Sequence, residues 1–169
     1  MNSKEDKLFN IETAKKTFGI QRWGNHYFDI NNNGHAVVKN PEDKGFAPVS
    51  FFDIIQEIQK RGLKTPLLLR IEHILEQNIH NMNKAFHDAI KKAKYQNYFR
   101  GVYPLKVNPQ EKIVKDVVHF GDRYKYGLEV GSKAEMLAAL ATLKLSNSLI
   151  VCNGYKARDL LILGYMQSS

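Results

Sequence analysis

A lysine near the end of an apolar run is the first residue of this sequence that invites a chemical explanation. Lys106 lies in FRGVYPLKVNP, residues 99–109, which has the composition of a β-strand that ends at a turn. Side chains alternate across a strand. Tyr103, Leu105 and Val107 therefore share the face that helices would cover, and the lysine points to the opposite side. A buried lysine has a lowered pKa and becomes an amine nucleophile that forms Schiff bases with carbonyl compounds.

A lone strand lysine also has a simpler explanation, which is an exposed edge position or a side chain that reaches out to water. The next apolar run, however, supplies a partner. Residues 127–131 read GLEVG, and Leu128 and Val130 share the face that helices would cover. Glu129 then falls on the same side of the sheet as Lys106. Pyridoxal 5'-phosphate (PLP) is the cofactor that most often uses a lysine of this kind.

Two further apolar runs are expected to extend the same sheet. The first, PLLLRI at residues 66–71, places Arg70 on the side away from its apolar neighbours, where it could line the same interior. The other, SLIVCNG at residues 148–154, places Val151 and Asn153 on one face. Together with the two runs described above, these segments predict a sheet with polar groups along one side.

Helical patterns follow the strand-like runs, and their apolar spacing predicts helices at residues 74–95, 109–120, 133–143 and 157–164. Asn108 before Pro109 is an expected N-cap, and Ser132 with Glu135 has the spacing of a capping box. Strands that alternate with helices predict βαβ units and a parallel sheet. Sites in such folds are built where the strands end and the helices begin.

The first part of the chain has a different texture. It predicts a short amphipathic helix followed by a β-hairpin, with residues 6–19 for the helix and residues 26–30 and 35–39 for the strands. The turn between these strands is rich in Asn and Gly, which tolerate the backbone angles of a tight hairpin. Ser50 is the expected N-cap of a helix that ends near Gly62.

We divide the chain into an N-terminal helix and β-hairpin region, residues 1–49, and a βα region, residues 50–169. The βα region has about four strand–helix units, whereas a closed (β/α)₈ TIM barrel has eight and typically ~250 residues. The expected fold class is therefore α/β, with the first half of a TIM barrel after the hairpin. A complete, smaller α/β sheet is the alternative.

Composition narrows the classes of partner. The net charge is +8, but the lysines and arginines are spread along the chain, with no run longer than the Lys91–Lys92 pair. We therefore expect solvated helix faces and no nucleic-acid partner. No apolar run approaches the length of a membrane span, and the start lacks the apolar core of a secretory signal. With one cysteine there is no internal disulfide, and a reducing cytoplasm is expected.

Three motifs on successive expected strands, YPLKVN, GLEVGSKAEM and CNGYK, resemble the biosynthetic arginine decarboxylases. The upstream WGNHYFDINNNGHAVV is similar to the same family's N-terminal region, and the resemblance runs from about Phe18 to Tyr165. The family belongs to the alanine-racemase-like class of PLP enzymes. The resemblance implies a PLP-binding barrel in which Lys106 forms the Schiff base and Glu129 lies near the cofactor. It implies that L-arginine is converted to agmatine and CO₂ for polyamine biosynthesis, in a homo-oligomer.

Members of this family are much longer than the present chain. By resemblance, the glycine-rich phosphate loop, the carboxylate that holds the pyridine nitrogen and a histidine stacked on the ring lie outside it. We therefore interpret the sequence as an N-terminal fragment with little or no activity by itself. Other decarboxylases of the class, for ornithine or diaminopimelate, and a non-catalytic PLP-binding protein are the alternatives. Mg²⁺ is associated with the family, but no metal ligands are expected here.

Overall fold

The computed structural model describes residues 10–143 and 148–154. It consists of two compact units, the first ending at Arg70 and the second beginning at Ile71. Each unit is built around its own small sheet. The helix expected at residues 157–164 lies outside the described residues. Among the described helices, none is both long enough and apolar enough to cross a membrane.

The first unit is a three-stranded antiparallel sheet with short helices around it. Its elements are α1 (Ile11–Thr17), α2 (Ile20–Trp23), β1 (Phe28–Ile30), β2 (Ala36–Val38), β3 (Val49–Ser50) and α3 (Phe51–Lys60). The strands lie in the order β1-β2-β3, and Phe28 pairs with Val38, so the expected hairpin is confirmed. Ser50 also caps α3 as expected, because its hydroxyl oxygen accepts a hydrogen bond from the N–H of Asp53 at 3.2 Å.

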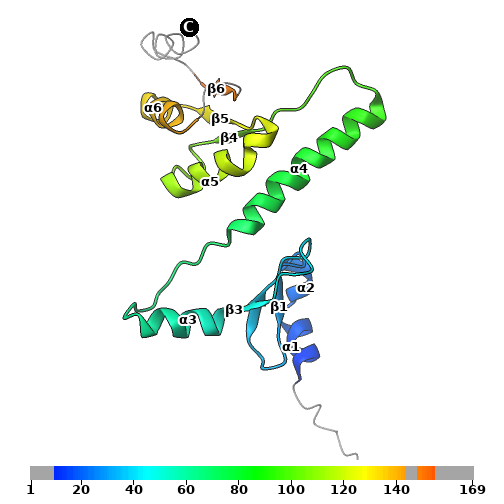
Figure 1. Ribbon diagram of the computed structural model, residues 1–169, viewed down its shortest axis with the longest axis vertical. Helices are drawn as coiled ribbons and strands as arrows, with labels where there is room; N and C mark the ends of the chain where they lie inside the picture. Colours follow the sequence, from blue (N-terminus) through cyan, green and yellow to red (C-terminus); the bar gives the residue numbers. More distant parts are fainter. Residues whose placement is uncertain (1–9, 144–147, 155–169) are drawn as a thin grey trace, which may run out of the picture. The chain divides into compact units, whose positions relative to one another are not determined.

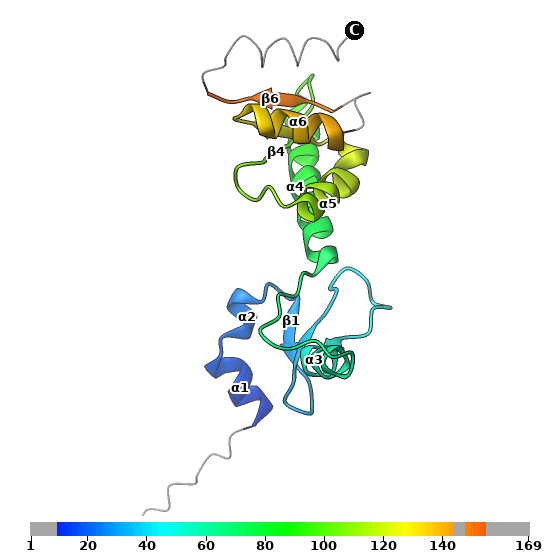
Figure 2. The same cartoon turned by 90° about the vertical axis from the view of Figure 1, so that its left-hand side faces the viewer.

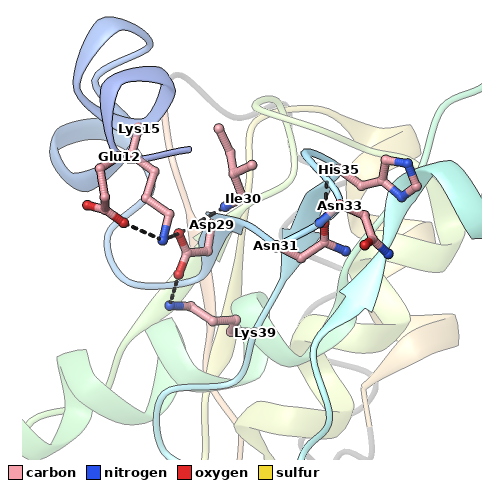
Figure 3. A network of polar contacts seen from close by, with 8 residues as sticks. All are labelled: Glu12, Lys15, Asp29, Ile30, Asn31, Asn33, His35 and Lys39. Atoms are coloured by element: carbon pink, nitrogen blue, oxygen red, sulfur yellow. Dashed lines mark hydrogen bonds and ion pairs between the residues drawn. The ribbon is translucent and has the colours of Figure 1, made fainter. Parts of the chain in front are cut away.

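The hairpin turn is closed by a side chain. Asn31 Oδ1 accepts hydrogen bonds from the backbone N–H groups of Asn33 at 3.0 Å and His35 at 2.9 Å (Figure 3). Gly34 has φ +78°, a left-handed conformation that glycine adopts without steric cost. The Asn- and Gly-rich sequence therefore forms the tight turn that fixes the register of the hairpin.

An ion-pair network connects α1 to both strands of the hairpin. The Asp29 carboxylate on β1 lies 3.1 Å from Lys15 Nζ and 2.8 Å from Lys39 Nζ, and Glu12 is 3.5 Å from Lys15 (Figure 3). Partial burial would raise the pKa of Asp29, but hydrogen bonds from Lys39, the Ile30 N–H and Lys15 outweigh it and lower the pKa to about 2. The carboxylate is therefore held firmly in its ionised form.

The second unit is a parallel sheet with helices between its strands. Its elements are α4 (Glu72–Ala93), β4 (Val102–Pro104), α5 (Glu111–Gly121), the short 3₁₀-helix η1 (Asp122–Tyr124), β5 (Gly127–Val130), α6 (Lys133–Thr142) and β6 (Ile150–Cys152). The strands lie in chain order, β4-β5-β6, and both pairs are parallel (Figure 1). This arrangement confirms the expected βαβ pattern for the three later apolar runs.

The core of the second unit lies between this sheet and its helices. Leu128 and Val130 are completely buried and pack with Leu105 from the end of β4, and with Met136 and Ala139 from α6. On the other side of α5, which runs beside α4 (Figure 2), a second apolar cluster is formed by Ile79, Val117 and Tyr126. The face of β5 that was expected to be covered by helices is thus the buried one.

Tyr126 also explains why glycine stands at two positions. A Cβ on Gly101 would lie 2.1 Å from the Tyr126 ring, and a Cβ on Gly121 would lie 2.5 Å from Tyr126 Cβ. The ring therefore packs directly onto backbone at two places, just before β4 and at the end of α5. This close approach sets the entry of the chain into β4.

Several expectations were wrong in detail. Residues 66–71 do not form a strand, and Leu68 is 77% exposed. The helix after β4 begins at Glu111 rather than at Pro109, and the Asn108 side chain accepts from the Gln110 N–H at 3.2 Å instead of capping the helix at its own position. Separately, α3 packs against β2 and β3, and the first compact unit extends to Arg70; the domain division at residue 50 stays a prediction.

Candidate functional site

Lys106 lies in a tight turn at the carboxyl end of β4. The ladder to β5 continues one residue past the strand, where the Leu105 N–H donates to the Glu129 carbonyl oxygen at 3.0 Å. The chain then turns, because the Val107 N–H donates to the Pro104 carbonyl oxygen at 3.1 Å. Alternation stops at this turn, so Val107 is 69% exposed and does not share the buried face of Leu105 as expected.

Glu129 is the nearest charged partner of the lysine. It lies on β5 between the buried Leu128 and Val130, and its register partner on β4 is Pro104. Its carboxylate Oε1 is 3.3 Å from Lys106 Nζ, and its side chain is 20% exposed. Two residues that the sequence placed on the same side of neighbouring strands are thus in contact across the ends of those strands.

Asn153, which follows β6, is a third member of this cluster. Its side-chain Nδ2 donates to Glu129 Oε1 at 2.7 Å, and its backbone N–H donates to the Val130 carbonyl oxygen at 2.9 Å. Sequence reasoning placed Asn153 on a common face with Val151 but did not select it. The sequence carried only part of the signal, since alternation places Asn153 on one face with Val151. The structure adds that Val151 is the register partner of Glu129.

The expected place of Lys106 in a barrel interior stays a prediction, because the chain spans about a quarter of its relatives' length. In the part of the chain that the structure describes, the Lys106 side chain is 58% exposed at the rim of the sheet. Arg70, the other basic residue expected there, lies outside any strand and belongs to the first unit. Its predicted place in the cofactor environment stays a prediction.

The corner between β5 and α6 is closely tied, immediately after Glu129. Ser132 Oγ accepts from the Glu135 N–H at 3.2 Å, and Glu135 Oε2 accepts from the Gly131 N–H at 2.6 Å. Ser132 and Glu135 are therefore capping residues, as expected, although the carboxylate reaches the N–H one residue earlier than in a standard capping box. This corner fixes the end of the strand that carries Glu129.

Other polar residues are not part of the cluster. His73, His80 and His87 recur at seven-residue spacing along α4, and the His80 ring lies at hydrogen-bond distance from the Tyr124 hydroxyl group. Within residues 10–143 and 148–154, no three His, Cys, Asp or Glu side chains are placed to hold a metal ion. A cavity of about 520 Å³ is lined by α4, residues 97–99 and Tyr124, and none of Lys106, Glu129 and Asn153 lines it.

Lys106, Glu129 and Asn153 together present an amine, a carboxylate and an amide to a ligand. A primary amine lies at the rim of a parallel sheet, with a carboxylate 3.3 Å away and an amide that holds the same carboxylate. An amine in this position can react with an aldehyde, and the carboxylate can hold the proton that the amine gains or loses. These groups fit the aldehyde end of PLP.

Two curated relatives of this chain are named biosynthetic arginine decarboxylase. The chain is 46% identical over 148 residues to the biosynthetic arginine decarboxylase of Gloeobacter violaceus, covering 88% of this chain and 23% of the relative. It is 39% identical over 153 residues to that of Prochlorococcus marinus subsp. pastoris, covering 90% and 24%. No protein-family model matches. The chain thus spans about a quarter of the length of these relatives.

A solved structure agrees with the sequence relatives. The crystal structure of the biosynthetic arginine decarboxylase SpeA from Campylobacter jejuni superposes with a TM-score of 0.80 at 39% identity. The match covers 89% of this chain and 24% of the solved chain. The α/β fold described above is therefore similar to a segment of that structure.

Proposed function

We propose that this chain is the N-terminal part of a cytoplasmic, PLP-dependent arginine decarboxylase that converts L-arginine to agmatine and CO₂ in polyamine biosynthesis. The observation that carries the proposal is 46% identity to a biosynthetic arginine decarboxylase over 88% of the chain. The contact between Lys106 and Glu129 at the ends of parallel strands supports it. In this proposal β4, β5 and β6 belong to the first half of a TIM barrel, of about four βα units.

Each residue of the cluster has a role in this proposal. Bound PLP supplies an electron sink for the carbon that loses CO₂. Lys106 would hold the cofactor through its amine, and Glu129 would keep that amine at the strand ends and take up the proton that the amine loses. Arg70 is proposed, from its place in the sequence, as a further group near the cofactor.

The rest of the active site is proposed to come from outside this chain. Because the chain spans 23% of its relative from Gloeobacter, the groups that bind the cofactor phosphate, the pyridine nitrogen and the substrate guanidinium are assigned to the remainder. The contacts that assemble a homo-oligomer and the ligands of any Mg²⁺ are likewise assigned to the remainder of the protein. We therefore expect the isolated chain to produce little or no agmatine.

The experiment that tests the proposal is covalent trapping. The chain is incubated with PLP, reduced with borohydride, digested and mapped by mass spectrometry. Lys115 provides a matched control, because its side chain is 61% exposed, close to the 58% of Lys106, and it also pairs with a carboxylate, Glu111 at 2.6 Å. Variants Lys106→Ala and Lys115→Ala are treated in the same way.

We expect one dominant pyridoxyl adduct at Lys106, which disappears in Lys106→Ala and persists in Lys115→Ala. Equal labelling of both lysines would contradict an organised cofactor site, since the two side chains have similar exposure. Agmatine formation is measured in parallel with L-arginine, and ornithine and diaminopimelate are tested as alternative substrates. Robust turnover of any of them by this chain alone would refute the proposed division of the active site.

A further inference from the structure

Two donors that follow different strands, β4 and β6, meet at a single oxygen atom of Glu129. Lys106 Nζ is 3.3 Å from Glu129 Oε1, and Asn153 Nδ2 donates to the same Oε1 at 2.7 Å. A carboxylate can only accept, so the amide of Asn153 must present its NH₂ group to it. The shorter of the two contacts is therefore the neutral one, and it comes from the strand on the other side of β5.

Asn153 is itself well placed to hold a neighbour. Its backbone N–H is hydrogen-bonded to Val130 at 2.9 Å, one residue beyond Glu129 on β5. Gly154, the next residue, has φ +79°, so the chain leaves the strand direction directly after Asn153 in a conformation that favours glycine. The backbone of Asn153 is thus bonded to β5 at the residue after Glu129, and its side chain reaches the carboxylate of Glu129 from there.

Lys106 has no comparable support. It lies in the turn that closes between Pro104 and Val107, and its flexible side chain is 58% exposed. A flexible lysine loses conformational freedom when it is held, so an exposed ion pair contributes little unless its partner is already fixed. A fixed Glu129 carboxylate therefore favours its contact with the Lys106 ammonium more than a mobile carboxylate would.

We infer that Asn153 is a positioning residue, which fixes the Glu129 carboxylate at the rim of the sheet and through it holds the Lys106 amine. The inference deepens the proposed function and rests on it for its catalytic meaning, because Lys106 is the lysine proposed to hold the cofactor. Its physical content can be tested without any cofactor, by measuring how accessible the amine is to a small acylating reagent.

The experiment compares the acylation rates of Lys106 and Lys115 in the same sample. The chain is treated with a limiting amount of an acetylating ester, and the two sites are quantified by mass spectrometry. Lys115, which pairs with Glu111, is the internal reference. The variants are Glu129→Gln, Asn153→Ala, Asn153→Gln and the double variant Glu129→Gln/Asn153→Ala, each checked for folding by circular dichroism.

We expect Glu129→Gln to raise the Lys106-to-Lys115 ratio by roughly two- to fivefold, the range that corresponds to losing an exposed ion pair. Asn153→Ala should raise the ratio by a smaller factor, and Asn153→Gln, which keeps an amide donor, should return it towards the wild-type value. In the Glu129→Gln background, Asn153→Ala should add nothing, because its effect passes through the carboxylate.

An unchanged or lowered ratio in Asn153→Ala would overturn the inference, and so would full additivity in the double variant. If substitution at position 153 disrupts folding, the wild-type side-chain amide resonance of Asn153 serves instead. It should move in Glu129→Gln and stay in Lys115→Ala; no movement in Glu129→Gln would contradict the contact. These results are independent of PLP trapping, so failure of the positioning role and failure of the proposed function are distinguishable.

Discussion

Each of the two units holds a carboxylate between donors from separate elements, and the two arrangements differ in what they leave accessible. In the first unit, Asp29 lies between the ammonium groups of Lys15 and Lys39, whose side chains are 20% and 36% exposed. All three members come from elements that pack together, α1 and the hairpin. The charges are satisfied within the unit, and the network acts as a structural clamp.

In the second unit, the Asn153 amide donates to Glu129, and the Glu129 carboxylate contacts the Lys106 ammonium, whose side chain is 58% exposed. The core residues next to Glu129, Leu128 and Val130, are buried, whereas the Lys106 amine is accessible to a ligand. The exposure of the charged side chains therefore distinguishes the two sites. The enclosed network around Asp29 stabilises the fold, whereas the exposed amine of the Lys106–Glu129 pair is available for chemistry.

The largest effect is expected from breaking the scaffold under the open pair. Leu128→Ala removes a completely buried side chain from the core of the second unit and should lower the free energy of unfolding by about 2–5 kcal/mol. It should also abolish selective trapping at Lys106. Urea unfolding measures the change. Leu68→Ala, at a side chain that is 77% exposed, is the control and should have little effect.

A smaller effect is expected from breaking the clamp. Asp29→Asn removes the carboxylate from between two lysines and should lower the free energy of unfolding by about 1–2 kcal/mol, less than the full pKa shift implies because water screens the network. Glu129→Gln should cost less than Asp29→Asn in the same urea titration. The comparison would fail if the order were reversed.

The clamp should also make stability depend on pH in the acid range. Asp29 has a pKa of about 2 in the folded chain and an ordinary value near 3.8. Because the folded pKa is the lower one, the unfolded state takes up the proton first, and the contribution present above about pH 5 is lost as the pH falls towards 2. Unfolding at several pH values should show a shallower loss in Asp29→Asn.

The smallest effect on the free energy of unfolding is expected for an ion pair that is exposed on a helix surface. Lys84 and Asp88 are 2.6 Å apart on α4, and their side chains are 62% and 56% exposed. Lys84→Ala should leave the unfolding midpoint close to that of the wild type. A loss as large as that of Asp29→Asn would show that exposure does not separate the classes of ion pair in this protein.

Structure was predicted most reliably from the sequence where a local rule, such as the alternation of side chains along a strand, applied. Alternation along β5 placed Leu128 and Val130 in the core and Glu129 on the side of Lys106, and the structure has these positions. The hairpin was predictable for a similar reason, since Asn31 and Gly34 support a tight turn. In both places local rules alone determine the outcome.

Prediction from the sequence was less successful where contacts with other segments of the chain determine the local structure. Residues 66–71 are apolar enough for a strand, but a strand also needs a paired partner, and none pairs with them among the described residues. Val107 was misplaced because a turn at Pro104 ends the alternation, which no count of apolar residues reveals. Asn153 was not selected because its importance comes from a contact 24 positions away.

The chain order of the sheet has a consequence for synthesis. Because β4, β5 and β6 are added side by side in the order in which they are translated, each strand can find its neighbour as soon as it leaves the ribosome. Lys106, Glu129 and Asn153 are separated by about one βα unit each. The nascent chain could therefore assemble this corner of the protein vectorially, from a short contiguous stretch.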